Sequence, residues 1–69
     1  MPESVYKIIE IVGTSTESWE AATRAAVERA GSTLRDLRIA EVEKLDVTVD
    51  NNKVALYRAK IKLSFKYEE

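Results

Sequence analysis

The sequence predicts a single α+β domain, residues 1–69, in which a three-stranded antiparallel sheet of order 1-3-2 packs on one helix in a βαββ arrangement. One stretch places apolar residues at every third or fourth position, and it stands between segments rich in Val, Ile and Tyr. That combination is typical of a helix that follows one strand and precedes others. In the second half, two long segments alternate apolar and polar residues on either side of a short turn, which indicates a hairpin.

The first strand and the helix are separated by Gly13. The segment from Val5 to Val12 is rich in β-branched and aromatic residues and predicts the strand. Among the hydroxyl residues that follow, Ser15 is the expected N-cap, and the helix is expected to run to about Leu34. The apolar stripe expected to face the sheet consists of Trp19, Ala22, Ala26, Ala30 and Leu34. Its alanines would allow the helix to lie close to the sheet.

The hairpin is the most regular part of the sequence. Its strands are expected from about Leu37 to Val49 and from Val54 to Tyr67. Asn51 and Asn52 are expected at the tip, because asparagine tolerates the positive φ of a two-residue turn. With this tip, apolar and charged positions match across the strands in one register. The expected apolar pairs are Val42 with Ile61 and Ala40 with Leu63, and the expected ion pairs are Glu43 with Lys60 and Glu41 with Lys62.

The expected strands are longer than the helix, which leaves part of the sheet uncovered. A strand of about 14 residues spans roughly 46 Å, whereas a helix of about 18 residues spans roughly 27 Å. A chain of 69 residues also buries little core, and this one has neither the cysteines nor the histidines that stabilise many small domains. We therefore expect self-assembly. The residues expected at the subunit interface are Leu45, Val47, Leu56 and Tyr67.

Several function classes fit the composition poorly. Without His or Cys the usual general base and thiol nucleophile are missing, so we expect no enzyme. The net charge of −1, and a basic row from Arg58 to Lys66 that faces away from the interleaved aromatic residues, argue against nucleic acid. No apolar run approaches a membrane span, and the segment from Met1 to Ser4 lacks the features of a secretory signal. We interpret the chain as complete and cytoplasmic.

Four local patterns have both a structural and a functional interpretation. Glu41 and Glu43 could act as an acid/base pair, but cross-strand ion pairs explain them better. The segment Gly13-Thr14-Ser15 could bind an anion at the helix start, but capping explains it better. The alternate residues from Asp46 to Asn52 faintly resemble a calcium loop, yet the glycine and final glutamate of that loop are missing, so a hairpin end is expected. Trp19 could stack on a ligand, but its place on the apolar stripe favours the core.

The succession of segments resembles the dodecins across nearly the whole chain. The resemblance rests on V-G-T-S-x-x-S-W-E from Val12 to Glu20, on A-E-V from Ala40 to Val42, and on the spacing to YRAKIKLSFK in the last strand. Dodecins are βαββ subunits that assemble as hollow homododecamers, and well-studied members bind flavins such as riboflavin or FMN in pairs. The resemblance therefore implies a homododecameric binding or storage protein.

The resemblance also assigns two positions of a flavin site. Ile39 stands where flavin-binding dodecins have a Trp that stacks on the isoalloxazine ring, and Arg58 stands where they have a Gln that hydrogen-bonds its polar edge. Because Ile has no π face and Arg has no acceptor, we expect flavin binding to be weakened. The same two residues resemble a dodecin subgroup with a calcium-binding member. A calcium-binding shell, whose ligands the sequence does not assign, is therefore one alternative, and a purely structural assembly is the other.

Arg58 also limits where an ion could bind. Its positive charge would repel a cation at the position of the flavin contact. A bound cation is therefore expected elsewhere, or an anion is expected beside Arg58.

Overall fold

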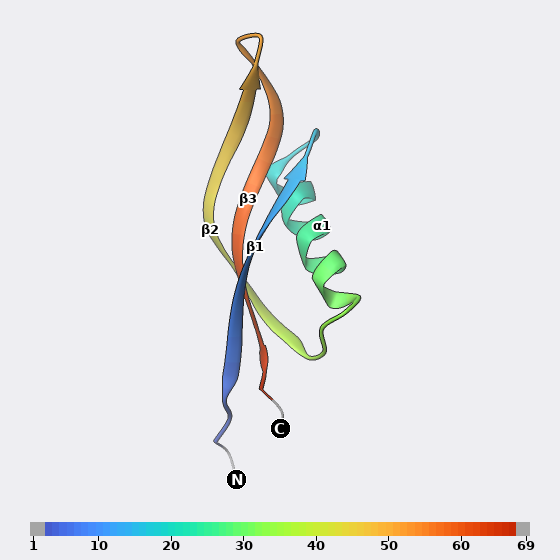
Figure 1. The fold of residues 1–69 in the computed structure, drawn as a ribbon, viewed down its shortest axis with the longest axis vertical. Helices are drawn as coiled ribbons and strands as arrows, with labels where there is room; N and C mark the ends of the chain where they lie inside the picture. Colours follow the sequence, from blue (N-terminus) through green and yellow to red (C-terminus); the bar gives the residue numbers. More distant parts are fainter. Residues whose placement is uncertain (1–2, 68–69) are drawn as a thin grey trace.

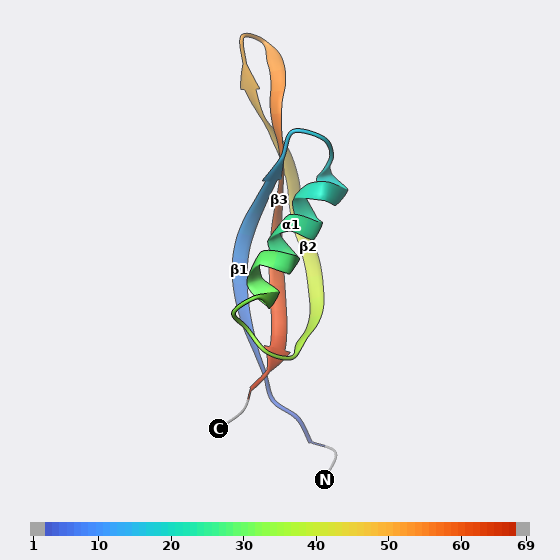
Figure 2. The same cartoon turned by 90° about the vertical axis from the view of Figure 1, so that its right-hand side faces the viewer.

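The computed structural model describes residues 3–67, which form β1 (Tyr6–Ser15), α1 (Trp19–Gly31), β2 (Leu37–Asp50) and β3 (Lys53–Lys66). β3 lies between β1 and β2 and runs antiparallel to both, so the predicted βαββ arrangement and 1-3-2 order are confirmed. α1 lies across one face of the sheet and packs mainly against β1 and β3 (Figures 1 and 2). No helix in the described residues is long and apolar enough to cross a membrane. The cytoplasmic location inferred from the start of the chain stays a prediction, and Met1 and Pro2 lie outside the described residues.

The helix begins later and ends earlier than the sequence predicts. Ser15 is not the N-cap, because β1 continues through it in the ladder with β3, and its Oγ accepts a hydrogen bond of 2.9 Å from the Glu17 N–H. Ser18 is the N-cap, with an extended backbone and a side chain that accepts from the Ala21 N–H at 3.0 Å. The predicted extension to Leu34 is also wrong. α1 ends at Gly31, and the Leu34 N–H beyond it donates a hydrogen bond to the Ala30 carbonyl. This bond gives a partner to one of the free carbonyls at the end of the helix.

The core is small and lies between α1 and β3. Its five buried residues are Ala22, Ala26, Ala59, Ile61 and Leu63, of which only the last two have large side chains. Gly13 on β1 permits the close approach of strand and helix, because a Cβ at this position would lie 2.2 Å from the carbonyl oxygen of Ala22. A core of this size leaves much of the apolar surface of the chain exposed.

The hairpin register agrees with the sequence beside the turn and from Ile39 to Val42, and it differs by one residue from Lys44 to Thr48. Asn51 and Asn52 form the turn with φ values of 54° and 61°. The predicted pairs Val42 with Ile61 and Ala40 with Leu63 are confirmed. Glu41 lies opposite Lys62 as predicted, but the ion pairs of Lys62 are with Glu10 and Glu43 instead. The predicted pair of Glu43 with Lys60 is wrong, because the register shifts by one residue between Thr48 and Val49 and back between Val42 and Lys44, which places Lys44 opposite Lys60.

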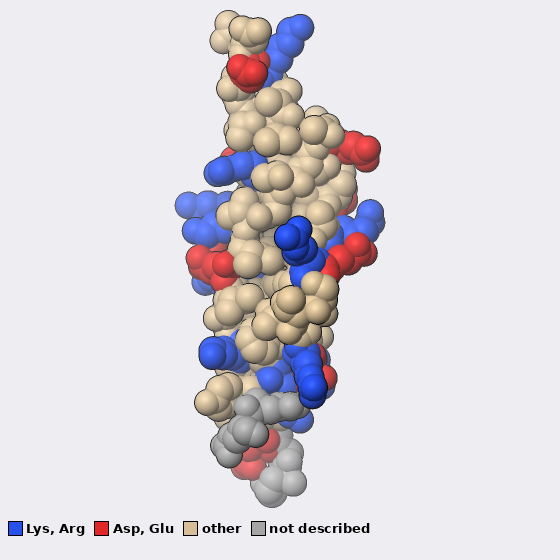
Figure 3. Space-filling view, turned by 45° about the vertical axis from the view of Figure 1, so that its right-hand side comes forward, with Lys and Arg blue, Asp and Glu red and all other residues tan. Residues whose placement is uncertain are grey.

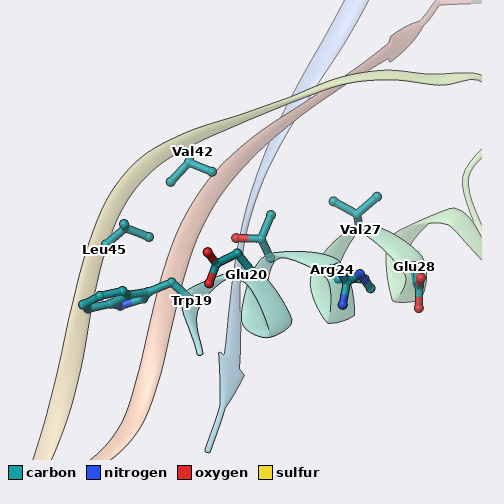
Figure 4. A pocket seen from close by; sticks show the side chains of 8 residues that line it. Trp19, Glu20, Arg24, Val27, Glu28, Val42 and Leu45 are labelled. Atoms are coloured by element: carbon teal, nitrogen blue, oxygen red, sulfur yellow. The ribbon is translucent and has the colours of Figure 1, made fainter. Parts of the chain in front are cut away.

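The register shift between Val42 and Lys44 has a physical reason that can be found in the sequence. In Val42-Glu43-Lys44-Leu45 two polar residues separate two apolar ones, where strict alternation allows one. A bulge absorbs the extra residue. As a result Val42 and Leu45 both point from β2 toward α1 (Figure 4). Glu43 then pairs with Lys62 instead, with 3.3 Å between Oε2 and Nζ.

The hairpin projects beyond the end of α1, as the comparison of element lengths predicts (Figure 1). We call residues 47–56 the hairpin arm. The molecule measures 55 × 20 × 15 Å, and the arm forms one end of its long axis. Val49 and Val54 near the tip are 65% and 53% exposed. The arm therefore presents apolar side chains that no other part of residues 3–67 covers.

Candidate functional site

Both site residues expected from the sequence lie on the face of the sheet that is turned away from α1, which we call the outer face. In β3 the buried residues Ala59, Ile61 and Leu63 face α1, so the residues between them point to the outer face. The ladders place their cross-strand partners on the same face. The outer-face residues used below are Ile8, Glu10 and Val12 of β1, Ile39, Glu41, Lys44 and Asp46 of β2, and Arg58, Lys60, Lys62 and Ser64 of β3.

Ile39 belongs to an apolar patch at one end of the outer face. It lies opposite Ser64, and Ile8 lies opposite the same serine from the other side. Ile39 and Ile8 are 64% and 60% exposed, and Tyr6 adjoins them along β1. These three residues, which we call the Ile39 patch, give a flat apolar surface with a single aromatic ring. Exposed aliphatic residues side by side on a sheet indicate contact with a ligand or another copy.

Arg58 has a partner that the sequence does not reveal. Its Nε donates to Asp46 Oδ1 at 2.7 Å and its Nη2 donates to Asp46 Oδ2 at 2.9 Å, a two-point contact across the ladder. The hydrogen bond from Arg58 lowers the pKa of Asp46, and the same bond raises the pKa of Arg58. Asp46 therefore compensates the charge of the guanidinium, which weakens the expected repulsion of a cation at this position.

Ile39 and Arg58 cannot meet within one chain. The β3 partner of Ile39 is Ser64, which lies six positions from Arg58 along the same strand. At about 3.3 Å per residue this separation is roughly 20 Å. A ligand contacted by both side chains must therefore lie between two copies of the chain.

The other charged residues of the outer face form a network of ion pairs. Glu10 Oε1 lies 3.8 Å from Lys60 Nζ, and Glu10 Oε2 lies 3.9 Å from Lys62 Nζ. The hydrogen bond with Glu43 raises the pKa of Lys62, and the charge of Glu43 adds to this effect. The ion-pair interpretation of Glu43 therefore holds with a different lysine, and its carboxylate is engaged rather than free to serve as a base.

The residues described offer no ready metal centre. Among residues 3–67, no group of three or more His, Cys, Asp or Glu side chains is placed to hold a metal ion. In the segment that faintly resembles a calcium loop, Asp46 is bound to Arg58, and Asp50 lies opposite Lys53 in the ladder beside the turn. This segment is a hairpin end, as the sequence interpretation expects.

A groove of about 650 Å³ lies on the opposite face, between α1 and β2 (Figure 4). Its apolar lining comes from Trp19, Val27, Val42 and Leu45, and Glu20, Arg24 and Glu28 lie at its polar side. The upper half of the face seen in Figure 3 is largely uncharged, with charged side chains gathered along both edges.

Trp19 is only partly in the core, against the expectation from the apolar stripe. It is 38% exposed, its ring meets Tyr57 edge to face at 5.2 Å, and its Nε1 donates to the Asp46 carbonyl at 3.0 Å. Its side chain thus connects the start of α1 to both strands of the hairpin.

Comparisons with known proteins identify the family. The family pattern described as Dodecin matches residues 5–68. Calcium dodecin of Mycobacterium tuberculosis is 48% identical over 91% of this chain and 89% of its own length, and dodecin of Thermus thermophilus is 43% identical over 94% of each. The structure of dodecin from Streptomyces coelicolor has a TM-score of 0.93 at 38% identity, covering 100% of this chain and 99% of that one. This chain belongs to the dodecin family.

Proposed function

We propose that this protein is a homododecamer without enzymatic activity, and that it binds and stores a flavin or a related small molecule on the outer face of its sheets. The observation that carries the proposal is the placement of Ile39 and Arg58 on one face but roughly 20 Å apart. A site that uses both residues exists only when copies bring their outer faces together. Binding and assembly are therefore linked.

Self-assembly is supported by the apolar surface that one chain leaves exposed. The Ile39 patch, the groove between α1 and β2 and the hairpin arm are all open, while the core has five buried residues. Dodecameric assembly and flavin binding are features of the dodecin family. Light scattering on a sizing column tests the assembly, because twelve copies of the 7.8 kDa chain have a mass of about 94 kDa. A monomer or dimer at micromolar concentration would contradict it.

Flavin binding is expected to be weak. Replacing an aromatic stacking partner by Ile39 forfeits about 0.5 to 1.5 kcal/mol beyond the area buried, and a polar ring edge without its acceptor costs roughly 1 to 3 kcal/mol. Together these effects weaken binding by about one to three decades. Quenching of riboflavin fluorescence during titration measures the affinity. Tight binding by the unmodified protein would show that other groups hold the ring.

Calcium binding is a second candidate, favoured by the 48% identity to calcium dodecin. The structure of calcium dodecin from Mycobacterium tuberculosis, 46% identical over 94% of this chain and 93% of that one with a TM-score of 0.84, is reported with a novel calcium-binding site. Residues 3–67 of one copy provide no cluster of three acidic side chains, so carboxylates of several copies or backbone carbonyls would have to contribute.

Two measurements on the purified oligomer distinguish the candidates. An absorption spectrum detects flavin, and elemental analysis after dialysis detects calcium in a fixed ratio to the protein. Flavin without calcium supports the first candidate, and calcium without flavin supports the second. A dodecamer that carries neither, and takes up neither on addition, would be a purely structural assembly and would contradict both.

A further inference from the structure

A second pocket on the outer face combines three cationic side chains with one carboxylate. Its volume is about 210 Å³, and it is lined by Val12, Lys44, Asp46, Arg58 and Lys60. All five residues come from one chain, so the pocket exists without the assembly. Three positive charges and one negative charge give the lining a net charge of +2.

Two register shifts in the hairpin, one between Thr48 and Val49 and one at the bulge between Val42 and Lys44, bring this positive charge together. In an unshifted register Glu43 would lie opposite Lys60, but Lys44 lies there instead. Like charges directly opposite each other on a sheet are unfavourable. Bulges often re-aim a side chain next to a functional site. The same bulge that turns both Val42 and Leu45 toward α1 (Figure 4) thus leaves the two lysines opposite each other on the outer face.

The neighbouring carboxylates leave one of the two lysines, Lys44, without an ion-pair partner among the described residues. Asp46 is engaged by Arg58 through both of its oxygens. Glu10 lies 3.8 Å from Lys60 Nζ but is shared with Lys62 at 3.9 Å. Within residues 3–67, Lys44 has no ion pair closer than 4.0 Å. An anion bound between Lys44 and Lys60 would compensate the charge of Lys44 and add to the contact that Lys60 makes with Glu10.

We propose that this pocket binds a phosphate dianion, either inorganic phosphate or the phosphate group of an organic monoester, between the ammonium groups of Lys44 and Lys60. Ammonium groups form charge-assisted hydrogen bonds to phosphate oxygens. Val12 provides an apolar wall, and the Arg58–Asp46 pair closes the pocket along the strands toward the hairpin arm. This anionic ligand differs from the cation that a calcium-binding shell would hold.

The decisive experiment compares thermal unfolding in phosphate and in chloride at equal ionic strength, pH and protomer concentration. Phosphate stabilises many proteins by exclusion from their surface, so the comparison between variants carries the test. We expect Lys44→Glu to raise Tm in chloride, because it places a carboxylate opposite Lys60, and to lose the additional stabilisation by phosphate. Lys44→Gln should lose that stabilisation without the full gain in chloride.

Lys53→Glu is the matched control, because it makes the same change of charge beside the turn, outside the pocket lining. It should keep the wild-type response to phosphate. Calorimetric titration with inorganic phosphate and with methyl phosphate tells the two sources of the ligand apart, and Lys44→Glu should weaken whichever binds by about tenfold or more. Equal phosphate responses in wild type, Lys44→Glu and Lys53→Glu, or the absence of a response in wild type, would overturn the proposal.

Discussion

Replacement of Gly13 by Ala tests the close contact between β1 and α1. The new Cβ would lie 2.2 Å from the Ala22 carbonyl oxygen and 2.9 Å from the Ala26 Cβ. Real Cβ atoms do not approach this closely, and the obstacle is backbone rather than the end of a flexible side chain. The helix must therefore move away from the strand. Gly13 has no positive φ, so the substitution introduces no strain in the strand itself.

The expected magnitude follows from two opposing effects. Overpacking of a core costs about 1 to 3 kcal/mol, and the backbone position of the clash places this site near 3 kcal/mol. Replacing a glycine also lowers the conformational entropy of the unfolded chain, which stabilises the folded state by about 0.4 to 1 kcal/mol. The net loss is about 2 kcal/mol, or roughly 8 to 16 °C in Tm for a domain of this size.

Gly31→Ala provides a control that should raise the free energy of unfolding, whereas Gly13→Ala should lower it. A Cβ at Gly31 meets Leu37 Cδ1 at 3.6 Å, an ordinary contact, and the residue closes α1 without positive φ. Helix propensity and the unfolded-state effect should stabilise this variant by about 0.5 to 1 kcal/mol. Both variants should be compared with wild type by thermal and denaturant unfolding at one protomer concentration, because assembly makes Tm depend on concentration. A Gly13→Ala protein as stable as Gly31→Ala would refute the packing argument.

Three further predictions concern the outer face and Trp19. Ile39→Trp should strengthen riboflavin binding by about three- to tenfold, measured by fluorescence quenching, since it restores a stacking ring while leaving the Arg58–Asp46 pair intact. No gain would show that the patch does not contact the ring. Because Arg58 lowers the pKa of Asp46 below its ordinary 3.8, the carboxylate stabilises the fold above about pH 4, and this contribution is lost as pH falls through the lowered pKa. The Tm difference between wild type and Asp46→Asn should therefore shrink between pH 5 and pH 2, and a constant difference would argue against the pair. Trp19→Phe should cost about 0.5 to 1.5 kcal/mol in denaturant unfolding, because it removes the Nε1 hydrogen bond to the Asp46 carbonyl but leaves a ring beside Tyr57, and an unchanged stability would show that this bond contributes nothing.

The regular parts of the fold could be predicted because local pattern and tertiary structure agree there. Alternation in β3 is unbroken from Tyr57 to Phe65, and the two asparagines at the tip set the register for the pairs on both sides. The helix start could not be placed, because Ser15 and Ser18 are both competent caps. The choice between them depends on how far the β1 ladder runs, which is a property of the assembled sheet.

The candidate site was predictable only in part. The sequence identifies Ile39 and Arg58 through the resemblance, but it does not show that roughly 20 Å separates them. The pairing of Arg58 with Asp46 depends on the register shift between Thr48 and Val49, and a single inserted residue changes which side chains meet. The two polar residues between Val42 and Leu45 are the signal that would have located the other shift, between Val42 and Lys44.

The position of β3 in the sheet constrains how the chain can fold while it is being synthesised. β1 and β2 each pair with β3 in the described residues, yet β3 follows both of them in the chain. Between the synthesis of Ser15 and that of Lys53 a ribosome adds 38 residues, which takes about 2 to 8 s at roughly 5 to 20 residues per second. During this interval β1 has no partner strand and α1 has no Ile61 or Leu63 to pack against. These two segments can then contact each other but not β3, and the sheet can form only after its central strand has emerged.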